Sequence, residues 1–216
     1  KFPLEIIKYV LMKTGVFTST IAEAGAFIKT KDELEAPNIQ LHYAPAMVID
    51  HGRKSAWGTG LSCHSCLLRP KSRGEVTLES ADPFADPLID PKFLTHPDDM
   101  QDMIDGYKAM MKVLNNASFS KYISQNTQRP IDINDDADIE KAIREEADTV
   151  YHPVGTCKMG DDDMSVVSSD LKVHKMKGLR VVDASIMPTL VGGNTNAPTI
   201  MIGEKASDLI LNEWRI

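Results

Sequence analysis

The sequence has few cysteines, few aromatic residues, no excess of basic charge and no long apolar run. Three cysteines in 216 residues are too few for a disulfide framework, and their odd number favours a reducing, cytoplasmic compartment. A net charge of −7 without a basic face argues against a nucleic-acid-binding protein. No apolar run approaches the roughly 20 residues that a membrane-spanning helix requires.

The chain begins with Lys1-Phe2-Pro3-Leu4-Glu5, which contains neither an initiator methionine nor a signal-peptide pattern. Such a start is typical of the interior of a protein, and we expect the chain to be part of a longer one. Its 42% of hydrophobic residues are enough for a buried core, and its length suits one domain or slightly more.

Cys63 and Cys66 form a Cys-x-x-Cys pair, a spacing that occurs in half a zinc site or in a redox couple. No second pair of cysteine or histidine residues has metal-ligand spacing. The surrounding segment 61–68 is predicted to be a strand, in which positions three apart face opposite sides. We therefore interpret both cysteines as small packing residues and predict no metal site.

Hydrophobic periodicity and turn residues predict alternating short strands and longer helices. The predicted helices cover residues 4–13, 97–114, 135–150 and 198–214. The predicted strands cover residues 23–29, 38–44, 61–68, 75–79 and 179–183, and a polar, glycine-rich loop covers 50–60. Segments 61–68 and 75–79 are expected to pair as a hairpin. An antiparallel sheet with the helices from about 97 and 135 on one face gives an α+β fold.

Individual residues are expected to end and anchor these helices. Gly15 is predicted to close the first one as a C-terminal glycine. Pro97 suits a first helical turn, and Asp98 and Asp99 complement its positive dipole. The apolar stripe that follows is more often core than a binding face. It consists of Met100, Met103, Ile104, Tyr107, Met111 and Leu114. The buried side of helix 135–150 is predicted to contain Ile139, Ala142, Ile143 and Val150.

Two polar residues lie where elements are expected to begin or end. His152 precedes Pro153, and a residue before proline is extended, so the helix from 135 should end close to His152. A lone histidine is more often structural than catalytic. Asn194 lies in a glycine-rich loop before the last helix, whose N-terminus stabilises negative charge. We assign Asn196 as the cap of that helix.

Several ordered sequence blocks point to one protein family. The first two are Tyr151-His152-Pro153-Val154-Gly155-Thr156-Cys157-Lys158-Met159-Gly160 and Leu179-Arg180-Val181-Val182-Asp183-Ala184-Ser185-Ile186-Met187-Pro188. The others are Gly193-Asn194-Thr195-Asn196-Ala197-Pro198-Thr199 and, upstream, 67–74, 80–83 and 87–91. Together they resemble the substrate-domain and C-terminal signatures of the glucose–methanol–choline (GMC) flavoprotein oxidoreductases.

This resemblance implies an enzyme that oxidises an alcohol to an aldehyde, with FAD as the hydride acceptor. His152 aligns with the family's active-site histidine and is expected to act as the base. Asn194 aligns with the second active-site position, which is His or Asn across the family. A neutral amide there can donate a hydrogen bond to the developing alkoxide.

The resemblance also implies which residues touch the cofactor. Asp183 and Ala184 fall where the family's chain contacts the flavin near its ribityl and pyrophosphate portion. Asn196, Pro198 and Thr199 fall where the last helix begins beside the isoalloxazine ring. The helix N-terminus would favour negative charge on the reduced flavin.

The family's phosphate-binding motif, G-x-G-x-x-G, is absent, because Gly58-Thr59-Gly60 lacks a third glycine at the required spacing. We therefore expect residues 1–160 to form the substrate-binding domain and residues 161–216 to return to a FAD-binding domain whose main N-terminal part is missing. By itself the chain is expected neither to bind FAD tightly nor to turn over, and its uncovered apolar faces are expected to favour self-association.

The sequence leaves several alternatives open. The substrate could be choline, whose trimethylammonium group needs an aromatic cage and a carboxylate. Trp57 and Tyr43 are the upstream candidates for a cage, and only 6% of residues are aromatic, which slightly favours a non-quaternary alcohol. A non-catalytic substrate-binding or interaction module, a flavin-containing lyase, the electron acceptor and membrane association of the intact enzyme also stay open.

Overall fold

The computed structural model describes residues 2–214 except 21, 51–52, 55–59 and 124–129. It contains antiparallel strand pairs together with helices, so the predicted α+β class is confirmed. The chain divides into two compact units. The first unit comprises residues 1–66 and 102–148, and the second comprises 67–101 and 149–216. The boundary expected at residue 160 concerns the intact enzyme and stays a prediction.

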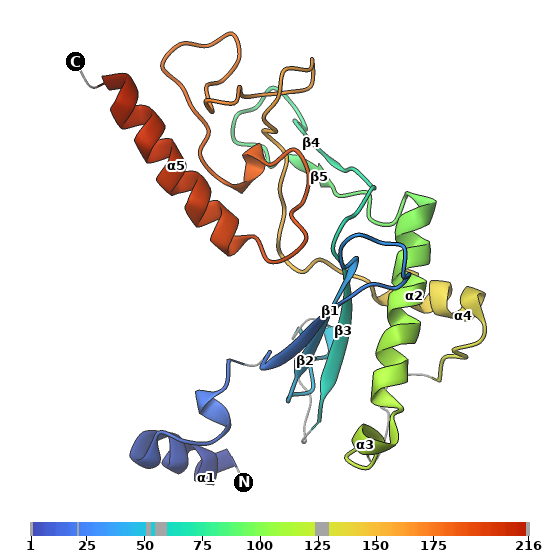
Figure 1. The fold of residues 1–216 in the computed structure, drawn as a ribbon. Coiled ribbons are helices and arrows are strands. Elements are labelled where there is room, and N and C mark those ends of the chain that lie inside the picture. The colour runs from blue at the N-terminus through green and yellow to red at the C-terminus, as the bar shows by residue number, and fades with distance from the viewer. Residues whose placement is uncertain (1, 21, 51–52, 55–59, 124–129, 215–216) are drawn as a thin grey trace. The chain divides into compact units, whose positions relative to one another are not determined.

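A three-stranded sheet forms the centre of the first unit (Figure 1). Its strands are β1 (Ala24–Ile28), β2 (Ile39–Ala44) and β3 (Ser62–Leu67), in the order β1-β2-β3. In the antiparallel β1–β2 pair, Ala24 lies opposite Tyr43 and Ile28 lies opposite Ile39. The strands predicted at 23–29, 38–44 and 61–68 are thus confirmed. The loop predicted at 50–60 lies mostly outside the described residues.

Helices α2 (Pro97–Leu114) and α4 (Asp136–Glu146) lie on one side of this sheet, and α3 (Ala117–Ser120) follows α2 (Figure 1). Gly106 lets α2 approach β2 and β3 closely. A Cβ at this position would lie 2.8 Å from Ile39 Cδ1 and 2.7 Å from Ser65 Oγ. Ile39 and Ile139 are fully buried, so they form the centre of this core.

The predicted stripe of α2 is largely confirmed. Met100 and Ile104 are buried, while Met103, Tyr107, Met111 and Leu114 are half-buried. Met110, which the sequence did not single out, is buried as well. The burial therefore extends further around the helix than the predicted stripe does.

Helix α4 buries Ile139, Ala142 and Ile143 as predicted, but it ends at Glu146 and not near residue 150. Two side-chain contacts favour a different path for the backbone beyond it. Asp148 forms an ion pair with Arg53 at 2.5 Å, and Thr149 Oγ1 accepts a hydrogen bond from the Tyr151 N–H at 2.9 Å. The Thr149 bond is local, and local side-chain bonds to the backbone compete with helix continuation, whereas the Arg53 ion pair joins residues 95 positions apart. Val150 consequently lies outside the helix and is exposed.

The N-terminal helix consists of α1 (Phe2–Ile7) and a π-helical turn, η1 (Lys8–Met12), close to the predicted range 4–13. Lys13, with φ 54°, closes it, because the Thr14 N–H donates back to the Lys8 carbonyl. Gly15 instead precedes the short 3₁₀ helix η2 (Val16–Thr18). The prediction that Gly15 closes the first helix was wrong.

In the second unit, β4 (Glu75–Thr77) pairs antiparallel with β5 (Leu88–Asp90). The predicted hairpin between 61–68 and 75–79 was therefore wrong. The chain between them is held by the buried carboxylate of Asp99, which accepts hydrogen bonds from Lys71 N at 2.8 Å and Ser72 N at 2.7 Å. These bonds fix the 71–72 turn to the first turn of α2, so the chain does not fold back on β3.

Apolar residues from three separate segments form the core of the second unit. The buried members are Val167, Leu171, Ile186, Met187, Ile202 and Ala206. They join the 167–171 segment, the 3₁₀ helix η4 (Ala184–Ile186) and the last helix, α5 (Asn196–Trp214). In the described part of the chain, no helix has both the length and the apolarity needed to cross a bilayer.

The strand predicted at 179–183 was wrong. This run forms an isolated bridge between Lys172 and Arg180, supported by hydrogen bonds from Val173 N to Leu179 O and from Val181 N to Leu171 O. The backbone then enters η4, which Asp183 caps. Apolar residues in the run therefore reflect packing against the α5 core, to which Val181 and Val182 contribute.

Candidate functional site

His152, Asn194 and Thr195 meet in the second unit. The Nε2 atom of His152 lies 3.0 Å from Asn194 Nδ2, and its Nδ1 atom lies 2.8 Å from Thr195 Oγ1. The imidazole is half-buried, Asn194 is exposed and Thr195 is only 8% exposed. The structure thus brings together the two residues that the sequence proposed as catalytic, and it adds Thr195, which the sequence analysis missed.

Backbone hydrogen bonds hold the segment that carries His152. The Cys157 N–H donates to the Ser185 carbonyl at 3.0 Å, and the Met159 N–H donates to the Ile186 carbonyl at 2.8 Å. Gly155 has φ 88°, and a Cβ there would also lie 3.3 Å from the Met187 carbonyl oxygen. The two motif-bearing segments, 151–160 and 179–188, are therefore joined directly.

The turn before His152 differs from the one expected. His152 does not end a helix, because α4 stops at Glu146 and five residues intervene. Tyr151 adopts the left-handed conformation, with φ 63°, immediately before it. Pro153 follows and restricts the backbone of His152 to extended geometry. The imidazole is thus presented from an irregular segment.

The hydrogen-bond partners define the protonation of the imidazole. With its amide N–H facing the ring, Asn194 donates to Nε2, which must then carry a lone pair. In the neutral ring the proton is consequently on Nδ1, which donates to Thr195 Oγ1. The atom beside Asn194 is therefore the one that can accept a proton.

Helix α5 begins immediately after this group. The Thr195 carbonyl accepts hydrogen bonds from Thr199 N at 3.0 Å and Thr199 Oγ1 at 2.7 Å. Because this carbonyl starts the helical ladder, Thr195 is the residue that precedes the helix, and Asn196 is its first helical residue. The assignment of Asn196 as the cap was wrong. Pro198 lies in the first turn, as predicted.

The residues proposed to touch the flavin lie on neighbouring elements of the second unit. Asp183 is exposed and accepts a hydrogen bond from Ser185 N at 2.7 Å, which caps η4, and Ala184 is the first residue of η4. Asn196, Pro198 and Thr199 form the start of α5, which η4 contacts. Pro198 has no N–H and the Thr199 N–H is bonded to the Thr195 carbonyl, so the N–H groups of Asn196 and Ala197 are the donors that the helix start can offer, together with its positive dipole. The Asp183 carboxylate can accept from hydroxyl groups. This donor and acceptor set fits a flavin and its polyhydroxylated chain.

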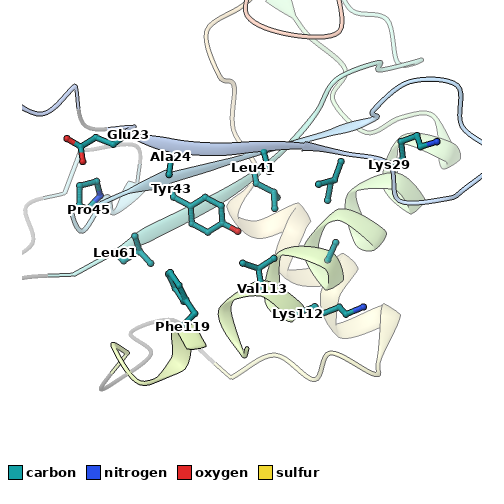
Figure 2. Close-up of a pocket in the computed structure, with 13 residues that line it drawn as sticks. Glu23, Ala24, Lys29, Leu41, Tyr43, Pro45, Leu61, Lys112, Val113 and Phe119 are labelled. Carbon is teal, nitrogen blue, oxygen red and sulfur yellow. The ribbon is translucent and has the colours of Figure 1, made fainter. Parts of the chain in front are cut away.

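The first unit contains a cavity of about 660 Å³ between the sheet and helices α2 and α3 (Figure 2). Most of its lining is apolar, and Leu41, Val113 and Phe119 are examples. The rings of Tyr43 and Phe119 meet edge to face, with centroids 6.4 Å apart. Burial, together with the neighbouring Cys63 thiol, raises the pKa of Tyr43 to about 12, so its hydroxyl stays protonated. Three charged residues also line the cavity, namely Glu23, Lys29 and Lys112. Trp57 lies outside the described residues.

Cys63 and Cys66 are thiols outside any disulfide, and both are half-buried on β3. Burial raises the pKa of the Cys63 thiol to about 11 and also raises the pKa of Cys66. Metal binding and thiol exchange both need the thiolate, which burial disfavours here. Among the described residues, no group of three or more His, Cys, Asp or Glu side chains could hold a metal ion. The geometry is thus consistent with packing residues.

Comparisons with known proteins agree with the sequence motifs. Residues 70–203 match the family described as GMC oxidoreductase. The chain is 46% identical over 208 residues to an alcohol dehydrogenase (acceptor) from Pseudomonas putida, covering 96% of this chain and 38% of that protein. It is 42% identical over 197 residues to an oxygen-dependent choline dehydrogenase from Klebsiella pneumoniae, covering 91% of this chain and 36% of that protein.

A solved structure shows the same fold. The formate oxidase of Aspergillus oryzae, which has been studied for the modification of its FAD, superposes with a TM-score of 0.88 at 25% identity. The match covers 99% of this chain and 42% of that one. The chain therefore spans less than half the length of the relatives it matches. On this evidence the chain belongs to the GMC oxidoreductases, a family of FAD-dependent flavoproteins.

Proposed function

We propose that this chain supplies the proton-transfer residues of an FAD-dependent enzyme that oxidises an alcohol to an aldehyde. The observation that carries this proposal is the position of His152 Nε2, which lies 3.0 Å from Asn194 Nδ2. An acceptor and a donor at this spacing can both reach one hydroxyl oxygen. Such a pair suits a reaction in which that oxygen loses a proton and gains negative charge.

In this mechanism the alcohol oxygen replaces the direct hydrogen bond between Asn194 and Nε2 and lies beside both side chains, because Nε2 has a single lone pair. Its proton passes to His152 Nε2, which acts as a general base. Asn194 donates its amide N–H to the same oxygen and stabilises the developing alkoxide without contributing a charge. FAD, when bound, accepts the hydride that leaves the carbinol carbon.

The second unit also supplies the contacts for the cofactor. Asp183 is proposed to accept from hydroxyl groups of the ribityl chain, beside the backbone of Ala184. The first turn of α5, with Asn196, Pro198 and Thr199, is proposed to face the flavin ring. Its N-terminal dipole would stabilise negative charge on that ring. These contacts are made by backbone and neutral groups, except for the Asp183 carboxylate.

A primary alcohol without a quaternary ammonium group is the substrate class that the observations favour. Choline is the second candidate, but its trimethylammonium group needs aromatic faces and a carboxylate, and only 6% of the residues are aromatic. The higher identity to the alcohol dehydrogenase, 46% against 42%, points the same way.

One activity assay tests both the reaction class and the substrate. The full-length protein is incubated with an artificial electron acceptor and either a medium-chain primary alcohol or choline. We expect the aliphatic alcohol to reduce the acceptor with the higher kcat/KM. A higher kcat/KM for choline would reverse the substrate assignment. Absence of acceptor reduction with every alcohol would favour a non-catalytic module or a lyase.

The chain alone is proposed to be inactive, because it contains no phosphate-binding glycine motif and spans 38% of the first relative. Large apolar side chains on both terminal helices are exposed, including Leu11, Met12 and Trp214. Flavin absorbance and light scattering of the purified 216-residue chain test these points. We expect a colourless, self-associating protein. Stoichiometric flavin or a clean monomer would contradict the corresponding part.

A further inference from the structure

We propose that Thr195 is a positioning residue that keeps the Nδ1 atom of His152 protonated, so that Nε2 faces the reacting alcohol as a lone pair. This inference rests on the proposed function, in which Nε2 accepts the alcohol proton. Thr195 itself touches neither the alcohol nor the transferred hydride in this account. It acts through the imidazole.

The position of the Thr195 hydroxyl is strongly constrained. Its oxygen lies 2.8 Å from His152 Nδ1, and the residue is 8% exposed, so water has little access to replace the contact. Its carbonyl is fixed by two hydrogen bonds from Thr199, at 3.0 and 2.7 Å. A β-branched side chain also has few rotamers. The start of α5 therefore places this oxygen on the histidine ring.

The partner on the other side of the ring, Asn194, determines which ring nitrogen carries the proton. The Asn194 amide N–H can only donate, and it faces Nε2 at 3.0 Å. Nε2 must accept, so the single proton of the neutral ring is on Nδ1. Thr195 Oγ1 accepts that proton, since a hydroxyl can act as either donor or acceptor.

Loss of the hydroxyl would leave the Nδ1–H group without its partner in a part-buried contact. An unpaired buried donor is unfavourable, and the ring can relieve it by rotating or by moving the proton to Nε2. Either change removes the lone pair from the side that faces the alcohol. The expected effect is therefore on catalysis, while substrate binding changes little.

The first test uses the full-length enzyme with bound FAD and measures kcat and KM separately. Thr195→Val keeps the shape and the carbonyl that begins α5 but removes the hydroxyl. We expect kcat to fall about 10- to 100-fold, which is less than the loss expected when the general base itself is removed. KM should be nearly unchanged. Thr195→Ser restores the hydroxyl and should recover most of the wild-type kcat. Thr195→Val with wild-type kcat would overturn the inference.

A matched control removes another threonine hydroxyl from the same unit. Thr95 Oγ1 donates to the Lys92 carbonyl at 3.0 Å, and Thr95 is exposed. Thr95→Val should keep the wild-type kcat. If Thr95→Val lowered kcat as much as Thr195→Val, the loss would reflect general destabilisation, and the positioning role would be rejected.

A second measurement needs no variant. Nitrogen-15 NMR of the histidine-labelled full-length enzyme distinguishes a proton on Nδ1 from a proton on Nε2. We expect the Nδ1–H tautomer for His152 in the wild-type enzyme, and an Nε2–H tautomer would overturn the inference. His152→Gln separates the two proposals. If it abolishes turnover while Thr195→Val does not, the proposed function stands and the role of Thr195 fails.

Discussion

Each of the two units is stabilised internally by a different set of interactions. In the first, a three-stranded sheet and the helices α2 and α4 enclose fully buried side chains such as Ile39 and Ile139. In the second, η4, α5 and irregular segments are joined by isolated bridges and backbone hydrogen bonds, including the bond from Cys157 N to Ser185 O. The candidate catalytic pair lies in this second, less regular unit.

This contrast teaches where each kind of substitution should act. A change in the first unit alters packing and therefore stability. A change near His152 or Asn194 removes a chemical group from a half-buried or exposed position, so it should cost activity more than stability. His152→Gln and Gly106→Ala test this division, and Asp99→Asn tests the stability of the second unit itself; the three follow from the largest expected effect to the smallest.

The largest effect is expected for His152→Gln in the full-length enzyme. Loss of the general base should lower kcat by roughly 10²- to 10⁴-fold, with little change in thermal unfolding temperature. His174 provides a matched control, because its Nε2 atom bonds the Gly160 carbonyl at 2.9 Å in the same unit. His174→Gln should keep kcat. A His152→Gln enzyme with normal kcat would contradict the expectation that substitutions near His152 reduce activity more than stability.

Asp99→Asn tests the turn that redirects the chain after β3. Burial raises the pKa of this carboxyl, but hydrogen bonds from Lys71 N and Ser72 outweigh it and lower the pKa below its ordinary value. We expect a loss of about 2–3 kcal/mol in the free energy of unfolding, because an amide replaces a carboxylate that accepts several buried hydrogen bonds. Denaturant unfolding of the full-length protein at pH 7 measures it.

The pH dependence of the Asp99 contribution follows from the direction of its shift. A lowered folded-state pKa stabilises the protein above the unfolded value, about 3.9, and this contribution is lost as the pH falls through the folded-state pKa. The stability difference between wild type and Asp99→Asn should thus be constant near neutrality and shrink below about pH 4. A difference that grows on acidification would refute the assignment.

The smallest effect is expected for Gly106→Ala in the first unit. The added methyl group would press against Ile39 and Ser65, and overpacking of this kind costs about 1–3 kcal/mol, partly offset by the better helix propensity of alanine. The kcat of the folded enzyme should not change. Adding Ile39→Val removes the Cδ1 atom at 2.8 Å but keeps a Cγ atom near 3.0 Å, so it should recover part of the loss. No recovery would argue against this contact between α2 and β2.

Part of the fold could be predicted because the signal is local. The strands β1, β2 and β3 and the helix α2 follow from alternation, periodicity and the acidic residues after Pro97. These patterns show which face of a single helix or strand is buried, and burial of that face stabilises the helix or strand. Such patterns carry no information on which distant segment pairs with which.

The errors arose where a distant partner decided the outcome. The hairpin prediction failed because Asp99 holds residues 71 and 72 from almost thirty positions further along the chain. Strand β5 was missed because it has three residues between two prolines, Pro87 and Pro91. The helix predicted to reach 150 ends at Glu146, and Asp148 beyond it pairs with the distant Arg53.

The candidate site shows the same limit. Family motifs identified His152 and Asn194, and the structure brings them within hydrogen-bonding distance. Thr195 escaped notice because its contact with His152 spans 43 positions, and spacing alone does not show which atom of the ring it meets. Its place between Asn194 and Asn196 in the Gly-Asn-Thr-Asn run was the available signal. The catalytic and cofactor roles of these residues stay predictions.

A double-mutant cycle tests most directly the claim that His152 and Asn194 act on one oxygen. The kcat of the full-length enzyme is measured for wild type, His152→Gln, Asn194→Ala and the double variant. Residues that act as a unit are strongly non-additive. We therefore predict that the double variant loses little more than His152→Gln alone. Two independent losses that multiply in the double variant would contradict a shared site.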